Sequence, residues 1–190
     1  MSTLTGWTRQ VPQVWEEIQR TGQYSVREEY IQSKNDTIAD YYIRLYRWYT
    51  QKSRSYIHIP PEEEYPVWFS LSEGFRLQKV PDTVILKVEI PIEKALIIDI
   101  EMWEYRGNMM YVPVDKQDRN AFEKELARYG IGDETALAES AKGNYYPLLK
   151  KKIIDSWERL FTMPCKDPEK SYATTWGIQR EWVKEVISDE

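Results

Sequence analysis

The sequence predicts an α+β fold, in which a small, twisted and mostly antiparallel mixed sheet is covered by helices from the N-terminal part of the chain. The first observation behind this prediction lies in residues 83–104. Apolar side chains occupy every second position from 84 to 90, which is the pattern of a half-buried strand. After Pro91, the unbroken apolar run 96–98 is closed by Asp99 and indicates a strand buried on both faces.

The second observation is an amphipathic stripe between residues 37 and 53. Apolar and aromatic side chains recur there at steps of three and four residues, as on a helix with one buried face. They are Ile38, Tyr41, Tyr42, Leu45, Trp48 and Tyr49. Thr37 and Asp40 have the spacing of a capping box and predict where this helix begins. We expect the stripe to pack on the sheet, because such stripes are more often core than ligand platforms.

The segment before this helix predicts one strand and one further helix. Residues 4–10 have the composition of a short first strand. Pro12 suits the first turn of a helix and Gly22 suits its end, so a helix over 11–22 follows. Residues 24–26 predict a brief extended piece.

Further short strands are predicted at 67–71, 75–80 and 109–114. Between the last two, Asp99 is suited to cap a short helix that ends at Gly107. These pieces complete the sheet around the central pair of strands.

The last third of the chain predicts a helical insertion before two closing strands. Helical spacing of apolar residues runs through 116–161, with one face of the last helix formed by Leu149, Ile153, Trp157, Leu160 and Phe161. The closing strands are predicted at 172–178 and 183–187. We expect residues 1–190 to form a single α+β domain, with the insertion packed on the same core.

Composition narrows the class of function. Charged residues make up 30% of the 190 residues and the net charge is −5, so the broad basic surface typical of nucleic-acid binding is absent. The longest basic run, 150–152, reads as a solvated helix surface. Aromatic residues make up 14%, including eight Trp and fourteen Tyr, which is enough to build a core largely of rings.

Cys165 is the only cysteine and His58 the only histidine. An intramolecular disulfide is therefore excluded, and one Cys with one His cannot supply the usual zinc ligands. The N-terminal residues lack the pattern of a secretory signal, and no apolar run approaches the roughly 20 residues of a membrane span. We therefore expect a cytoplasmic protein with no membrane partner and no metal.

Common catalytic signatures are missing. The phosphate-binding motif G-x-x-x-x-G-K-[ST] and the nucleophile elbow G-x-S-x-G do not occur, and the single G-x-G, at 130–132, follows a helix instead of a strand. Asp99, Glu101 and Glu104 cluster where a buried strand ends, a position that suits a general acid or base. The alternative is that Asp99 caps a helix and both glutamates are solvated.

Several motifs together resemble an uncharacterised bacterial family, one of the domains of unknown function. The most specific are Trp7-Thr8-x-Gln10 and Ser156-Trp157-x-x-Leu160-Phe161. The others are Gly22-x-Tyr24, Tyr65-Pro66-x-Trp68, Ile90-Pro91, Asp99 with Trp103, Tyr111-x-Pro113 and Trp176-x-Ile178. The resemblance runs over most of the chain and implies no established activity.

At the level of the fold, the order of elements also resembles the small ADP-ribosyltransferase-like domains. This resemblance implies that NAD binds in a cleft between two short sheets. It also implies a His or Arg in the first strand, a hydroxyl group in the next core strand and a Glu near the last strands. Here Thr8 holds the first place, with Arg9 and Gln10 beside it, and Ser70 fills the second.

The resemblance also implies a role for each of these side chains and for an acid. Thr8 and Gln10 would hold the nicotinamide ribose side of NAD, and the ring of Trp68 would stack on it. Segment 171–178 has no Glu, so Glu181, which follows it, or Glu101 is the acidic candidate. The implied chemistry is departure of nicotinamide through an oxocarbenium-like state stabilised by polar groups.

Two functions of different class are therefore expected. The first is an ADP-ribosyltransferase-like protein that binds NAD or a related nucleotide, as a bacterial or phage conflict effector would. The second is a non-catalytic module that binds a protein target through surface aromatics. Thr8 and Gln10 share one side of the first strand, which favours the first function unless a strand edge or loop backbone satisfies them. The missing Glu favours the second.

Overall fold

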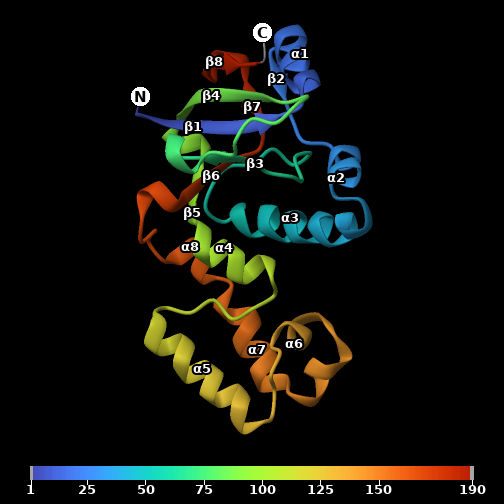
Figure 1. The fold of residues 1–190 in the computed structure, drawn as a ribbon, viewed down its shortest axis with the longest axis vertical. Coiled ribbons are helices and arrows are strands. Elements are labelled where there is room, and N and C mark those ends of the chain that lie inside the picture. Colours follow the sequence, from blue (N-terminus) through green and yellow to red (C-terminus); the bar gives the residue numbers. More distant parts are fainter. Residues whose placement is uncertain (1, 189–190) are drawn as a thin grey trace. The chain divides into compact units, whose positions relative to one another are not determined.

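The structure is a computed structural model that describes residues 2–188, and its fold is α+β, as predicted. The chain divides into two compact units, shown in Figure 1. One comprises Met1–Ile97 with Asp167–Glu190, and the other comprises Ile98–Lys166. The helical insertion predicted at 116–161 lies within the second unit.

The first unit is built on a six-stranded antiparallel sheet with the strand order β5-β6-β3-β1-β4-β8. Its strands are β1 (Thr3–Gln10), β3 (Val67–Ser70), β4 (Val84–Pro91), β5 (Leu96–Asp99), β6 (Ser171–Thr175) and β8 (Val183–Ile187). A second sheet consists of β2 (Gln23–Tyr24) and β7 (Ile178–Gln179). The central strands predicted from the alternation at 84–90 and the run at 96–98 are confirmed as β4 and β5.

Three helices belong to this unit: α1 (Pro12–Thr21), α2 (Glu28–Asn35) and α3 (Ala39–Ser53). Pro12 occupies the first turn of α1, and Gly22 ends it in the left-handed conformation at φ 85°, as predicted. Short 3-10 turns lie at Asp36–Ile38, Glu73–Phe75, Ile92–Lys94, Pro168–Lys170 and Arg180–Trp182.

One face of the sheet forms the main core of the first unit. Side chains of α1 pack there on β3, β4 and β6, and residues of β2 and β7 close the cluster. Its buried members are Val14, Ile18, Tyr24, Val67, Phe69, Val84, Leu86, Val88, Ile90, Ala173, Ile178 and Trp182. The alternation that predicted β4 therefore corresponds to this buried face.

The predicted capping box is wrong, because α3 begins at Ala39 and no side chain caps it. A helix that was not predicted, α2, runs to Asn35, and Asp36 then adopts a positive φ of 44°. The 3-10 turn Asp36–Ile38 follows directly. Only Ile31 of α2 is buried, so its sequence carries little of the apolar periodicity from which a helix is predicted.

Three predicted strands also differ from the structure. Residues 75–80 and 109–114 are not strands, and 172–178 divides into β6 and β7 around Gly177, at φ 145°. A side chain at Gly177 would place its Cβ 2.9 Å from the carbonyl oxygen of Tyr24, so the chain must turn there on a glycine.

In the irregular segment 109–114, backbone N–H groups donate hydrogen bonds to side chains and not to a neighbouring strand. The N–H of Val112 donates to Oγ of Ser156 at 2.9 Å, and the N–H of Val114 donates to Asp118 at 2.9 Å. The apolar residues of this segment read as a strand, but these side-chain partners replace a ladder.

The second unit is helical. It contains α4 (Ile100–Gly107), α5 (Lys116–Arg128), α6 (Thr135–Glu139), α7 (Pro147–Ser156) and α8 (Arg159–Thr162), with a 3-10 turn at Ala141–Tyr145. Asp99 caps α4 by accepting hydrogen bonds from the N–H groups of Glu101 and Met102, as predicted. The face predicted for a single last helix is shared by α7 and α8, and Trp157 between them is 5% exposed.

None of the helices within residues 2–188 combines the length and the apolarity that crossing a bilayer requires.

Candidate functional site

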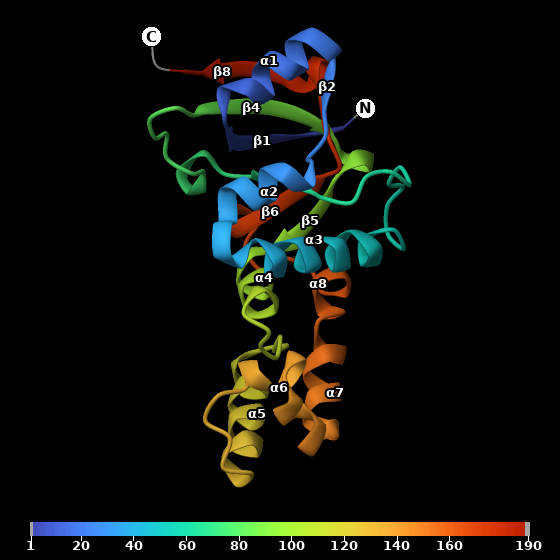
Figure 2. The same cartoon turned by 90° about the vertical axis from the view of Figure 1, so that its right-hand side faces the viewer.

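The six-stranded sheet is joined at its middle by a single residue pair. Strands β1 and β4 are in register from Thr3–Pro91 to Gln10–Val84, whereas Trp7 and Ser70 are the only pair between β1 and β3 in the described part of the chain. Figure 2 shows β1 and β4 running side by side, while β6 and β5 run off at an angle to them. The sheet therefore consists of two halves, β5-β6-β3 and β1-β4-β8, that diverge from this pair.

The register places the predicted ligand-binding residues on two different faces. Thr8 is opposite Leu86 and Gln10 is opposite Val84, so both belong to the face that forms the main core. Ser70 is opposite Trp7 and therefore belongs to the other face, as does Trp68 two residues earlier. The sheet lies between the two pairs, and Trp68 is not a wall beside Thr8 and Gln10.

The side chains of Thr8 and Gln10 form a hydrogen bond with each other. The Gln10 Nε2 amide donates to Oγ1 of Thr8 at 2.8 Å, and Thr8 is only 5% exposed. A strand side chain two residues away thus provides the partner that a buried hydroxyl needs. Within residues 2–188, no other hydrogen bond of the Gln10 side chain is present, so its carbonyl oxygen keeps its acceptor capacity.

Trp68 is enclosed by other rings. Its ring stacks on Tyr49 of α3 at 5.4 Å between centroids, lies 6.0 Å from Tyr46 and meets the edge of Tyr172 at 5.7 Å. Tyr49 shares a hydrogen bond of 2.7 Å with Thr174 of β6. These contacts attach α3 to the half-sheet β5-β6-β3, so the aromatic stripe packs on the sheet as expected.

Ser70 is also held within the protein. It is 5% exposed, and its hydroxyl donates to the carbonyl oxygen of Ser72 at 2.9 Å. This bond fixes the chain where it leaves β3.

The two candidate acids lie in different units. Glu181 is exposed in the 3-10 turn Arg180–Trp182 of the first unit, and Glu101 is exposed in the first turn of α4 in the second. Asp99, in contrast, is buried and its oxygens accept three backbone N–H groups, so it acts as a helix cap. Glu181 is therefore the candidate acid that shares a unit with Thr8 and Gln10.

Positive charge gathers near the C-terminal end of β1. The pKa of Lys34 on α2 is lowered by desolvation from surrounding protein atoms and by the positive charge of Arg9. Arg9 donates from Nη1 to the carbonyl oxygen of Gln78 at 2.7 Å, which ties the loop before β4 to this strand end. Sequence reasoning did not find Lys34, because the influence of Arg9 on it depends on how α2 is placed.

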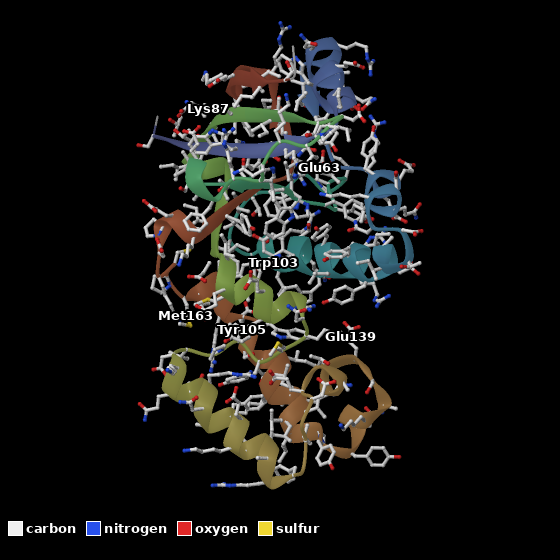
Figure 3. All side chains as sticks on the ribbon, viewed as in Figure 1. Glu63, Lys87, Trp103, Tyr105, Glu139 and Met163 are labelled. Carbon is white, nitrogen blue, oxygen red and sulfur yellow. The ribbon has the colours of Figure 1, made fainter. Side chains whose placement is uncertain are left out.

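The remaining polar groups on the outer face of β1 and β4 pair with one another. Thr5 and Thr3 donate to Glu89 at 2.8 and 2.9 Å, and these bonds lower the pKa of Glu89. Lys87, labelled in Figure 3, has its Nζ 5.8 Å from the ring centroid of Trp7. Polar side chains of this face thus have partners on the neighbouring strand.

No group of three or more His, Cys, Asp or Glu side chains in residues 2–188 is arranged to hold a metal ion.

The sequence of the chain matches a known protein family. The profile of a family described as "Domain of unknown function (DUF3841)" matches residues 5–184. The chain belongs to the DUF3841 family. The predicted membership of a family of unknown function is therefore confirmed, and the match covers both units of the DUF3841 fold. Neither a curated protein nor a solved structure matches the chain.

Proposed function

We propose that this DUF3841 protein binds NAD or a related nucleotide where the two halves of its sheet diverge, and that it is ADP-ribosyltransferase-like. The observation that carries the proposal is the single Trp7–Ser70 pair between the halves. The ADP-ribosyltransferase-like domains that the sequence resembles hold NAD between two short sheets. Strands β1 and β3, which would carry the first two characteristic positions, are adjacent in the sheet order, in keeping with that resemblance.

The amide of Gln10 suits the carboxamide of nicotinamide. One N–H of Gln10 is engaged by Thr8, and the carbonyl oxygen remains available at the end of β1. A planar amide presents a donor and an acceptor side by side, which is the complement of another amide. Gln10 therefore recognises the nicotinamide end, and Thr8 orients its side chain.

Arg9 and Lys34 suit the pyrophosphate of the nucleotide. The pKa of Lys34 is lowered first by desolvation and then by the positive charge of Arg9, and a bound anion would offset that repulsion. Guanidinium groups also bind phosphate oxygens through two parallel hydrogen bonds. The nucleotide thus spans the end of β1, with its charged centre at these two cations.

Glu181 is the acid in this proposal, and Glu101 of the second unit is the other candidate. In the transfer step, the bond between ribose C1′ and the nicotinamide nitrogen breaks, and its electron pair leaves with nicotinamide. An acceptor nucleophile forms a bond to C1′ and gives its proton to the Glu181 carboxylate. That negative charge also stabilises the oxocarbenium-like state. Ser70 and Trp68 support the strand from its other face.

The acceptor in this proposal is a protein target or a nucleotide, and the setting is a bacterial or phage conflict in the cytoplasm. The acceptor and the conflict setting follow from the resemblance, and the cytoplasmic setting follows from the single cysteine.

Titration calorimetry of the purified chain with NAD, ADP-ribose and nicotinamide tests the proposal. Gln10→Ala is expected to weaken NAD binding about tenfold, the value of one lost hydrogen bond. It also removes the partner of the Thr8 hydroxyl, so some stability is lost, but binding should be weakened by more than folding. Gln13→Ala, an exposed glutamine on α1, is the control and leaves binding unchanged. Arg9→Gln weakens NAD and ADP-ribose but not nicotinamide, and Arg20→Gln is its control.

The second candidate is a non-catalytic module that binds a protein target. The contacts of Trp68 with Tyr46, Tyr49 and Tyr172 favour this candidate. The Trp68 ring already packs against other rings of the protein, so it needs no ligand to cover it. Absence of both binding heat and thermal shift with millimolar NAD or ADP-ribose would reject the nucleotide site and leave this candidate.

A further inference from the structure

Two large apolar side chains of the second unit lie almost entirely in water. Tyr145 is 83% exposed at the end of the 3-10 turn Ala141–Tyr145, and Leu148 is 81% exposed in the first turn of α7. Leu149 and Ile153 of the same helix are buried, so the orientation of α7 is fixed by its core-facing side. The outward side of α7 thus presents apolar area that the unit itself does not cover.

A shallow hollow of about 400 Å³ is formed by residues that neighbour these two in the chain. It is lined by Gly143, Asn144, Pro147, Lys150, Lys151, Ile154 and Asp155. Pro147 and Ile154 give it an apolar wall, and Ile154 is 40% exposed. The volume is enough for one or two apolar side chains of a partner.

The hollow carries an uncompensated positive charge. Lys151 is paired with Asp155, and Lys152 is paired with Glu125. Lys150 has no ion-pair partner anywhere in residues 2–188, although its side chain packs against Gly143. The hollow therefore has a net charge of +1 in a chain whose net charge is −5.

The turn before α7 is closely packed. A Cβ on Gly143 would lie 2.0 Å from the carbonyl oxygen of Leu137, so the turn before α7 rests directly on the backbone of α6. The N–H of Tyr146 donates to the carbonyl oxygen of Gly143 at 3.1 Å, which continues the turn into α7. A preorganised surface pays less ordering entropy when a partner binds.

We propose that the face formed by Tyr145, Leu148 and the hollow binds an acidic peptide segment of another protein. An apolar side chain of the peptide enters the hollow against Ile154, and a neighbouring carboxylate pairs with Lys150. Tyrosine is enriched among the residues that dominate binding energy at interfaces, which suits Tyr145. A single uncompensated lysine is too few for nucleic acid or an anionic membrane, which need several phosphate contacts.

Selection of a random dodecapeptide phage library on the full chain tests this proposal. Peptides that combine acidic residues with a large apolar residue are expected to be enriched. A synthetic peptide of the enriched sequence is then titrated against the full chain and its variants. Leu148→Ser and Lys150→Glu should each weaken binding at least tenfold, and added salt should weaken it further. Leu77→Ser and Lys124→Glu, which change an exposed leucine and an exposed lysine elsewhere, leave binding unchanged.

Circular dichroism melting of each variant shows whether it is folded. The proposal is overturned if no peptide is enriched, if enriched peptides lack acidic residues, or if they bind the Leu148→Ser/Lys150→Glu double variant as tightly as the wild type. It is equally overturned if a single-stranded oligonucleotide or vesicles of anionic phospholipid, and not acidic peptides, bind this face.

Discussion

The carboxylate of Asp99 accepts a hydrogen bond from the backbone N–H of Lys166 at 3.1 Å, although 67 residues separate them in the chain. The other carboxylate oxygen caps α4 through Glu101 and Met102 at 2.9 and 3.2 Å. Asp99 therefore connects the first and last residues of the helical unit as well as starting its first helix.

Replacement of this carboxylate is expected to loosen the second unit. Asp99→Ala removes the cap and leaves the N–H of Lys166 without its partner, which should lower the free energy of unfolding by about 1–3 kcal/mol. Urea denaturation measures this change. Asp155→Ala, which breaks only an exposed ion pair, should change stability by less than about 1 kcal/mol. If both substitutions lowered the free energy of unfolding equally, Asp99 would not connect the two ends of the helical unit.

Gly143 is expected to tolerate no side chain. The clash of a Cβ with the Leu137 carbonyl oxygen predicts that Gly143→Ala costs about 1–3 kcal/mol or more. At Gly132 a Cβ meets nothing within 4 Å, so Gly132→Ala should lie within about 0.5 kcal/mol of wild type. Thermal melting of both variants makes the comparison, and a neutral Gly143→Ala would contradict the packing of the turn on α6.

Trp157 is expected to contribute strongly to stability. Its ring is 5% exposed, Nε1 donates to the carbonyl oxygen of Met110 at 2.9 Å, and the Arg106 guanidinium lies 3.7 Å from its centroid. Trp157→Ala should therefore cost about 3–5 kcal/mol. The exposed Tyr145→Ala is the control. A denaturation midpoint equal to that of the wild type would remove Trp157 from the core.

The lowered pKa of Asp118 should make the stability of the protein depend on pH. Burial raises its pKa, but hydrogen bonds from the Val114 N–H, the Tyr111 hydroxyl and Arg159 outweigh this and leave the pKa below its usual value. A pKa depressed on folding stabilises the protein above the unfolded pKa, about 4, and this contribution is lost as pH falls through the folded pKa.

The stability difference between wild type and Asp118→Asn should accordingly shrink as pH falls from 7 to 3. Urea unfolding at a series of pH values measures it, with the exposed Glu104→Gln as the control. A difference that stays constant over this range would mean that the carboxylate does not titrate differently in the folded state.

The sequence predicted those elements whose signals are local. The alternation of β4, Pro12 and Gly22 at the ends of α1, and Asp99 as the cap of α4 each depend on residues close together in the chain. The strand predicted at 109–114 was wrong because its structure depends on residues far away in the chain. Its apolar residues read as a strand, but Ser156, 44 residues from Val112, satisfies its backbone.

The candidate site was predictable only in part. The alternation of side chains placed Thr8 and Gln10 on one side of their strand correctly. Whether Trp68 shares that side depends on the register between β1 and β3, which no local pattern encodes. The charge pair of Arg9 and Lys34 depends in turn on α2, a helix with too little periodicity to predict.

The most direct test of the central claim is a titration of the isotopically labelled chain with ADP-ribose, followed by amide correlation spectra. If the nucleotide binds where the half-sheets diverge, the largest shifts should fall on the amides of residues 7–10 and 67–71, and Gln10→Ala should reduce them. Spectra that do not change at millimolar ADP-ribose, or shifts confined to residues 98–166, would contradict it.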